Sequence, residues 1–530
     1  MNVPTRQGLI RVWQTDGERC QYPEHYLLGA GPLTGMCFSG GSTRAYAAAI
    51  GQLRALTELG LIRKINYISS VSGGAWAAVA YTFYAGSGES DFEILGKVET
   101  PSTLSIEKLN QINPKALGYA ATQDFSRVLR TTHQDSSIPV SDVWSHAIGR
   151  TFLEPFGLFD SKCRTGFTLD TETYREFCLR NPSEHRPEPH RVRPVATRPY
   201  LLVHATLNWP VQSKEHSALV NRVGFEFSAL AAGSPHLLTL LSEGGEPHRV
   251  GGGFVEVGGV GCLAPSVKRD DHGLVSVCCQ GPPLSLADVV GASSAFSSKE
   301  KEQHYYPRIT HWPVSERTDE VASTEVLSDG GDVENYGLIA LLRRRVKSIV
   351  VFINTLWPLS LDYDPSTWPA IHHDGHHSVD PFLAPLFGQP NSRFPHNQVF
   401  AERDFSDVVG ALQEAKRVGC ALVTTQLHRV QSNDWWGLEG GWEAQICWVY
   451  NDRIPEWEAQ LSPELCAMVE EGNGRSPKGP VARFPHYLTR GQNAGSLIRL
   501  SPVQVNLLSH LASWTVTANA STFVKLFRDP

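Results

Sequence analysis

The sequence has no long apolar run. No stretch approaches the roughly 18 consecutive apolar residues of a bilayer-spanning helix, and residues 1–21 lack the apolar centre of a signal peptide. We therefore expect a cytoplasmic location, with peripheral attachment to membranes left open. Cysteine is sparse, at ten in 530 residues, and only Cys278 and Cys279 lie close together in sequence, so we expect mostly reduced thiols rather than a disulfide scaffold.

The chain also has no excess of positive charge. Its 47 basic and 54 acidic side chains leave a net charge of −7 at pH 7, which gives no general attraction to nucleic acid or anionic lipid. We therefore expect no nucleic-acid partner, and transient contact with a membrane or lipid-droplet surface must come from a local patch. Hydrophobic residues make up 41% and charged residues 19%, which is enough apolar material for a large core.

What is present is an alternation of strand and helix patterns near the N-terminus. Residues 35–39 predict a short strand, a helical spacing of apolar residues follows until Gly60, and residues 65–71 and 75–84 repeat the order. Such alternation favours an α/β fold with a mainly parallel central sheet. Further buried strands are expected at 200–207, 346–354, 421–427 and 446–450, and Ser501, Pro502 and Gln504 predict the start of a C-terminal helix.

The domain prediction is a single domain over residues 1–530, because the motifs described next are separated by about half of the chain. Its core segments are about 33–85, 199–235, 284–360 and 420–530. The intervening segments, about 86–198 and 236–283, are expected to be insertions that supply a lid or cap. Within them, the proline-punctuated stretch 186–194 is expected to be a surface segment, and the glycine-rich stretch 244–261 is expected to be loop.

Ser72 lies where a hydrolase places its nucleophile. It separates a predicted strand from a predicted helix and is followed by Gly73 and Gly74, and a tight turn between strand and helix forces one side chain outward. A serine hydroxyl needs a base to take its proton, and acyl transfer creates an oxyanion that needs prepositioned donors. The order of the segments therefore predicts a serine acyl hydrolase.

Two other segments supply the missing parts. Residues 39–44 form a second strand-to-helix turn, in which the backbone N–H groups of Gly40, Gly41 and Ser42 are the predicted oxyanion donors. Residues 327–335 carry Asp329, the predicted proton acceptor or orienting carboxylate for Ser72. Each motif alone is a common turn sequence, but each of the three follows a strand-like run.

The chain resembles the catalytic domains of patatin-like proteins, cytosolic phospholipase A2 and fungal phospholipase B. Residues 39–45 (SGGSTRA) are similar to the oxyanion loop of that family, residues 71–76 (VSGGAW) to its nucleophile turn, and Asp329 with Asn335 to its aspartate segment. Weaker patches that keep the family's order lie at 142–144, 200–208, 225–235, 284–296 and 446–451.

The resemblance implies a three-layer α/β/α core and a Ser72–Asp329 dyad without histidine. It implies hydrolysis of fatty-acyl esters of glycerophospholipids or lysophospholipids through an acyl-enzyme, with no cofactor and no metal. Arg44 would bind the substrate phosphate; the alternative for this side chain is a surface arginine paired with a carboxylate. Gly74, Gly330 and Asn335 would support the site. Calcium is not implied, since fewer than forty residues precede Ser39 and the family's calcium-binding β-sandwich needs more.

Four alternatives stay open at the level of sequence. The same dyad also suits an acyltransferase that passes the acyl group to a lysolipid or an alcohol, and it suits a neutral-lipid esterase. Many histidines follow Asp329, which leaves a Ser-His-Asp triad as a third interpretation. The fourth is a lipid-binding module that keeps the fold but does not catalyse hydrolysis.

Overall fold

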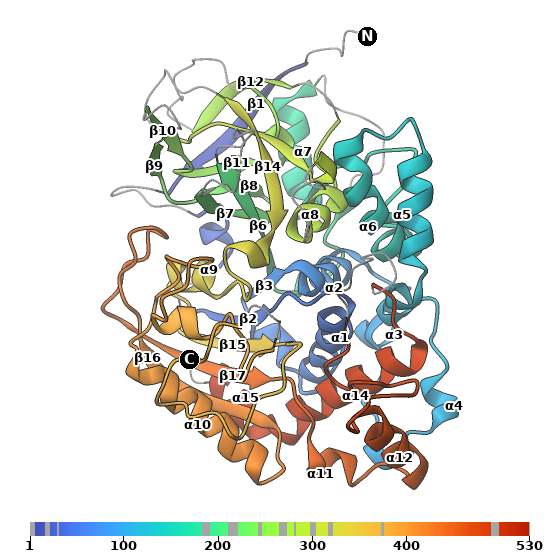
Figure 1. The fold of residues 1–530 in the computed structure, drawn as a ribbon. Coiled ribbons are helices and arrows are strands. Elements are labelled where there is room, and N and C mark those ends of the chain that lie inside the picture. Colours follow the sequence, from blue (N-terminus) through green and yellow to red (C-terminus); the bar gives the residue numbers. More distant parts are fainter. Residues whose placement is uncertain are drawn as a thin grey trace.

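The computed structural model describes residues 6–15, 22–28, 31–88, 90–182, 191–209, 221–241, 246–263, 273–279, 282–296, 304–315, 322–372, 376–488 and 498–528. A 13-stranded sheet organises this part of the chain (Figure 1). Its strands, in spatial order, are β12 (Leu274–Cys279), β1 (Arg6–Gln14), β11 (Gly253–Glu256), β8 (Ala231–Ser234), β7 (Asn221–Ser228), β6 (Tyr200–Trp209), β3 (Tyr67–Val71), β2 (Thr34–Phe38), β15 (Ser348–Ile353), β17 (Glu443–Tyr450) and β16 (Leu422–Arg429), while β14 (Ser323–Asp329) pairs with β6 and with β13 (Arg308–His311).

The centre of this sheet is parallel. Strands β6, β3, β2, β15 and β17 run in one direction, and all residues of β2, β3 and β15 are buried, as expected for parallel strands covered on both faces. The predicted α/β fold with a parallel central sheet is therefore confirmed. The sheet is wider and more mixed than the sequence pattern suggested, because the strands outside this centre join it antiparallel.

Helices lie on both faces of the central strands (Figure 1). Gly74 of α2 packs on Phe38 of β2, whereas Leu341 of α9 packs on Gly35 of the same strand. Because side chains three residues apart on a strand point to opposite faces, α2 and α9 cover opposite sides of the sheet. The helices are α1 (Ser42–Glu58), α2 (Ser72–Phe83), α3 (Asp91–Leu95), α4 (Ile106–Leu109), α5 (Phe125–Gln134), α6 (Val143–Phe152), α7 (Thr171–Arg180), α8 (Leu286–Ser293), α9 (Leu338–Arg343), α10 (Arg403–Arg417), α11 (Pro455–Glu458), α12 (Pro463–Gly472), α14 (Pro502–Ala518) and α15 (Ala520–Arg528).

The local signals in the core segments match these elements. The Ser501 signature begins α14 with the expected capping box, in which the Ser501 hydroxyl accepts from the N–H of Gln504 and the Gln504 side chain accepts from the N–H of Ser501. Helix α14 packs along α1, which places the C-terminal region beside the first α/β unit.

The glycine-rich stretch 244–261 differs from its prediction as loop. Residues of this stretch form β10 (Pro247–Val250) and β11, and β11 lies between β1 and β8 in the large sheet. Glycine weakens strands, but Gly253 is needed there because a Cβ on it would overlap the carbonyl of Trp13 in the neighbouring strand. The basic stretch 186–194 falls mainly outside the described residues; β5 covers Arg191–Val192 and pairs with β4 (Phe167–Thr168).

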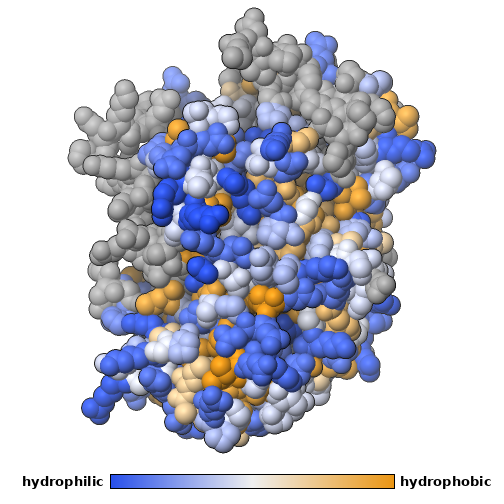
Figure 2. Space-filling view, turned by 90° about the vertical axis from the view of Figure 1, so that its right-hand side faces the viewer, coloured by the Kyte–Doolittle hydropathy of each residue, from blue (hydrophilic) through white to orange (hydrophobic). Residues whose placement is uncertain are grey.

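Two further findings bear on the composition. Seven cysteines are free thiols among the described residues, whereas Cys262 is disulfide-bonded, so the expectation of mostly reduced cysteines has one exception there. Of the described helices, none combines the length and the apolar character that crossing a membrane requires. On the face shown in Figure 2, apolar side chains gather in small separate groups within a largely hydrophilic surface.

Candidate active site

Strand β6 brings Ser72 and Asp329 together. Its first half pairs with β3 and its second half with β14, along the edge that β7 does not occupy. Strand β3 ends with Val71 opposite His204, and β14, running the other way, ends with Asp329 opposite Ala205. The two strands therefore meet head to head at adjacent positions of β6. The Ser72 hydroxyl donates a hydrogen bond of 2.8 Å to Oδ2 of Asp329.

The turn that carries Ser72 is strained and tightly packed. Ser72 has a φ of 51°, a left-handed conformation that is uncommon for any residue except glycine and is typical of a nucleophile held on a sharp strand-to-helix turn. The next two residues have to be glycine. A Cβ on Gly73 would overlap the carbonyl of Ser42, and one on Gly74 would lie 2.7 Å from the carbonyl oxygens of Phe38 and Ser39. The serine turn and the residue 39–44 turn are therefore in direct contact.

The carboxylate of Asp329 is oriented by its own turn. Its Oδ1 accepts from the N–H of Gly331 at 2.8 Å, which leaves Oδ2 to Ser72. Gly330 runs so close to β6 that a Cβ there would lie 2.5 Å from the carbonyl oxygen of His204. Asp329 and Ser72 are 8% and 7% exposed, so both sit at a largely desolvated position.

The predicted oxyanion loop lies against the serine turn. A Cβ on Gly40 would be 3.3 Å from Cβ of Ser72, and the amide of Gly40 donates to the carbonyl of Asn335 at 3.0 Å. Gly41 and Ser42, with φ values of 146° and 56°, make the turn into α1. The Gly40 amide is thus engaged by the aspartate segment, and Asn335 ties that segment to the loop.

Two known proteins are similar in sequence to a part of this chain. A segment of 117 residues, 22% of the chain, is 31% identical to cytosolic phospholipase A2 zeta from Homo sapiens, and 115 residues are 30% identical to the Mus musculus protein. The similarity to cytosolic phospholipase A2 zeta thus covers about a fifth of this chain. The matched segment spans 13% of each relative's length. No protein-family model matches.

Solved structures of lower similarity include human GIVD cytosolic phospholipase A2 and VipD from Legionella pneumophila. The first has a TM-score of 0.42 and 13% sequence identity. The match covers 94% of this chain and 60% of the phospholipase chain. The second has a TM-score of 0.21 and 14% sequence identity. The match covers 65% of this chain and 53% of the VipD chain.

Arg44, the phosphate ligand expected from the cytosolic phospholipase A2 resemblance, is 5% exposed. Its Nε donates to the carbonyl of Asn354 at 3.1 Å and its Nη1 to the carbonyl of Tyr487 at 2.8 Å. The interpretation as a surface arginine is therefore wrong. A role in binding phosphate stays a prediction.

Two residues near Ser72 and Asp329 were not singled out from the sequence. The N–H of Ser72 donates to Oγ of Ser293 at 2.9 Å, and His204 lies 2.6 Å through Nε2 from Oγ of Ser69. Ser69 donates its single hydroxyl proton to the carbonyl of Gly337, so the neutral imidazole donates from Nε2. His204 thus bonds to Ser69, while the hydroxyl of Ser72 donates to Asp329. Both residues lie in segments already noted for their similarity to the family, 200–208 and 284–296, but no local pattern set either apart from its neighbours.

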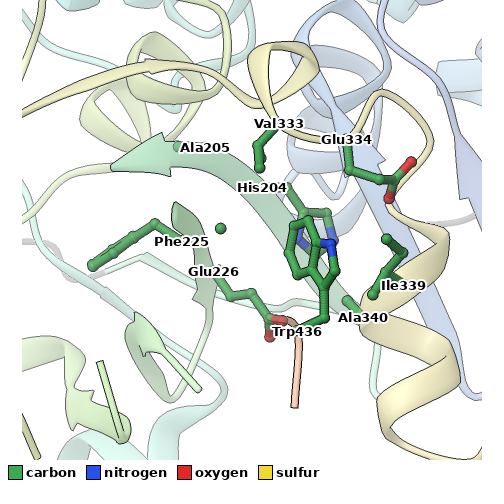
Figure 3. A pocket seen from close by; sticks show the side chains of 10 residues that line it. His204, Ala205, Phe225, Glu226, Val333, Glu334, Ile339, Ala340 and Trp436 are labelled. Atoms are coloured by element: carbon green, nitrogen blue, oxygen red, sulfur yellow. The ribbon is translucent and has the colours of Figure 1, made fainter. Parts of the chain in front are cut away.

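A small cavity of about 10 Å³ lies behind the aspartate segment, lined from β6, β7 and residues 333–340 (Figure 3). Burial raises the pKa of Glu334, on its wall, to about 7 against the opposing effect of backbone N–H donors, the first of them that of Tyr336. Burial lowers the pKa of His204 to about 4. The described residues include no group of three or more His, Cys, Asp or Glu side chains arranged to hold a metal ion.

Proposed function

We propose that the chain is a serine acyl hydrolase that cleaves fatty-acyl esters of glycerophospholipids or lysophospholipids through an acyl-enzyme on Ser72. The observation that carries the proposal is the hydrogen bond from the Ser72 hydroxyl to Oδ2 of Asp329 on a strained strand-to-helix turn. The partial similarity to the cytosolic phospholipases A2 supports the lipid substrate.

In this mechanism Ser72 Oγ attacks the ester carbonyl while its proton passes to Asp329. The tetrahedral intermediate collapses when Asp329 returns the proton to the leaving alcohol. Water then attacks the acyl-enzyme and gives a proton to Asp329. The fatty acid leaves when Asp329 passes this proton to Ser72 Oγ. Asp329 is 8% exposed, and its Oδ2 accepts the hydrogen bond of the Ser72 hydroxyl at 2.8 Å, so it is within reach of the proton that it would take.

The oxyanion needs backbone donors beside the serine. Gly41 and Ser42 stand at the positive end of α1, where helix N–H groups point outward, and Ser42 touches the turn of Gly73. We propose that they supply the oxyanion contact, while Gly40, whose amide donates to Asn335, shapes the loop. Gly74 and Gly330 act by allowing the close approaches already described.

The test is labelling with a fluorophosphonate, together with hydrolysis of phosphatidylcholine and lysophosphatidylcholine vesicles. Ser72→Ala is expected to abolish both. Asp329→Asn should lower the rate by on the order of 100- to 10,000-fold while the fold is retained. Ser70→Ala is the matched control, because its hydroxyl bonds to Leu202 and not to the dyad. Equal labelling of wild type and Ser72→Ala would refute the proposal.

A neutral-lipid esterase is the second candidate, and the position of Arg44 favours it, since two of its nitrogens donate to main-chain carbonyls. Parallel assays with a phospholipid and an uncharged acyl ester separate the two. Added acceptor alcohol reveals an acyltransferase through its ester product. Calcium independence, expected as unchanged turnover in excess chelator, and a cytoplasmic location with transient contact at lipid surfaces are parts of the same proposal.

A further inference from the structure

One short turn contacts the backbone of both dyad residues. Ser293 is the last residue of α8, and its Oγ accepts the hydrogen bond from the N–H of Ser72 at 2.9 Å. Two residues later, the carbonyl of Ala295 accepts from the N–H of Asp329 at 3.0 Å. Ser293 and Ala295 are fully buried. With the bond between Ser72 and Asp329, these contacts close a ring through the turn.

The N–H of Ser72 needs such a partner. Ser72 opens α2, and the first N–H groups of a helix have no acceptor within the helix. Its left-handed φ is a sparsely populated conformation, which persists only where the surroundings fix it. The hydroxyl of Ser293 is the side chain that meets this N–H and so fixes the direction in which Ser72 Oγ points.

Helix α8 is itself held firmly. A capping box between Ser285 and Asp288 closes its N-terminus, and Arg164 forms an ion pair with Asp288 there. Near its other end, Gly291 packs so tightly on Ser145 of α6 that a Cβ would overlap it. A group at the end of this helix therefore has a defined position.

We infer that Ser293 is a positioning residue that aims the nucleophile Ser72 at Asp329 through the backbone of Ser72, an inference that rests on the proposed acyl hydrolase function. Ser293 does not touch the substrate in this account. Its loss should therefore slow acylation without weakening substrate binding. A displacement of the nucleophile by about 1 Å is enough for a 100-fold loss.

The experiment measures the rate of fluorophosphonate labelling, kcat and KM on lysophosphatidylcholine, and Tm. Ser293→Ala is expected to lower the labelling rate and kcat about 10- to 100-fold, with KM within about twofold. Ser293→Thr keeps the hydroxyl acceptor and should stay within about fivefold of wild type. Ser294→Ala is the matched control, because it removes the neighbouring hydroxyl, which bonds within α8. It should label at nearly the wild-type rate.

Wild-type labelling by Ser293→Ala, or an equal loss in the alanine and threonine variants at unchanged Tm, would overturn the inference. Should the alanine variant fail to fold, Ser293→Cys takes its place, since the thiol still fills the site and is a weaker acceptor than the hydroxyl. A wild-type protein that neither labels nor hydrolyses any acyl ester would instead refute the proposed function itself, so the two failures are distinguishable.

Discussion

Glu334 and Glu226 show how strongly neighbouring groups alter the pKa of a buried carboxyl group. Both line the small cavity behind the aspartate segment (Figure 3). Burial acts to raise the pKa of each. At Glu226 the guanidinium groups of Arg344 and Arg343 outweigh burial and bring the pKa to about 2, whereas Glu334 has backbone N–H donors as its opposing partners and keeps a pKa of about 7.

The high pKa of Glu334 predicts a measurable pH dependence of stability. Between its ordinary value of 4.5 and about 7, the folded protein holds a proton that the unfolded chain has released. The free energy of unfolding should therefore fall as the pH rises through this window, by about 3 kcal/mol for this group. Glu334→Gln keeps the side-chain oxygen that accepts from Tyr336 and removes the titration.

The measurement is urea denaturation of both proteins from pH 4.5 to 8. The wild type should lose stability relative to Glu334→Gln as the pH rises. Parallel pH profiles of the two proteins would show that Glu334 does not titrate in this range.

Among the elements, α2 is fixed at both ends. Its N-terminus packs through Gly73 and Gly74 on the residue 39–44 turn. At its C-terminus, Arg198 donates through Nη1 to the carbonyls of Tyr81 and Tyr84 and pairs through Nη2 with Asp91 at 2.7 Å. Carbonyls at a helix end favour a cation, so this buried arginine is well placed. The helix therefore holds Ser72 against a rigid support.

Gly74→Ala is expected to break this arrangement. Its methyl group would lie 2.7 Å from two carbonyl oxygens, which forces the turn of Ser72 away from the residue 39–44 turn. We expect a loss of stability of about 1–3 kcal/mol and a strong fall in fluorophosphonate labelling. Gly410→Ala is the matched control, since nothing lies within 4 Å of a Cβ there, and inside helix α10 it should add about 0.5–1 kcal/mol. Wild-type labelling by Gly74→Ala would contradict this account.

At the scale of the whole molecule, one buried ionic cluster joins distant parts of the chain. Arg344, after α9, contacts Glu24 at 2.6 Å and Glu226 of β7 at 2.9 Å, and Arg343 also pairs with Glu226. The four side chains are between 1% and 5% exposed. The Arg344 guanidinium lies over the ring of Tyr22, with its central carbon 4.2 Å from the ring centroid. The segment before β2 is thereby tied to β7 and to the residues that end α9.

Glu226→Gln should be strongly destabilising, because it leaves two buried guanidinium groups with too little compensating charge. We expect a loss of about 3–5 kcal/mol at neutral pH, measured by chemical denaturation. The ion pair stabilises above pH 4.5 and its contribution disappears as the pH falls towards 2, so the difference from wild type should shrink in acid. Glu414→Gln, in the exposed pair with Arg417, should change stability by less than about 0.5 kcal/mol. Equal effects of the two substitutions would contradict the role of the cluster.

Local patterns predicted the elements that surround the site. Strand β2, strand β3, helix α2, strand β15 and helix α14 all begin within a few residues of the positions expected from apolar periodicity, glycine turns and the Ser501 cap. The same method misjudged residues 244–261, because β11 is a strand through its neighbours β1 and β8 and not through its own glycine-rich composition. Nor did any local signal indicate that Arg44 would be buried against Asn354 and Tyr487.

The sequence by itself determined which chemical groups are available: a serine between strand and helix, glycines that admit close backbone contacts, and an aspartate at a strand end. These features depend on neighbours in the chain, so local sterics and hydrogen bonding are enough to predict them. Only the tertiary structure decided that β3 and β14 end at adjacent positions of β6 and that Ser72 reaches Asp329. It also decided that Ser293 Oγ accepts the hydrogen bond from the N–H of Ser72. Strand register and helix docking join residues far apart in sequence, and they depend on packing over the whole fold.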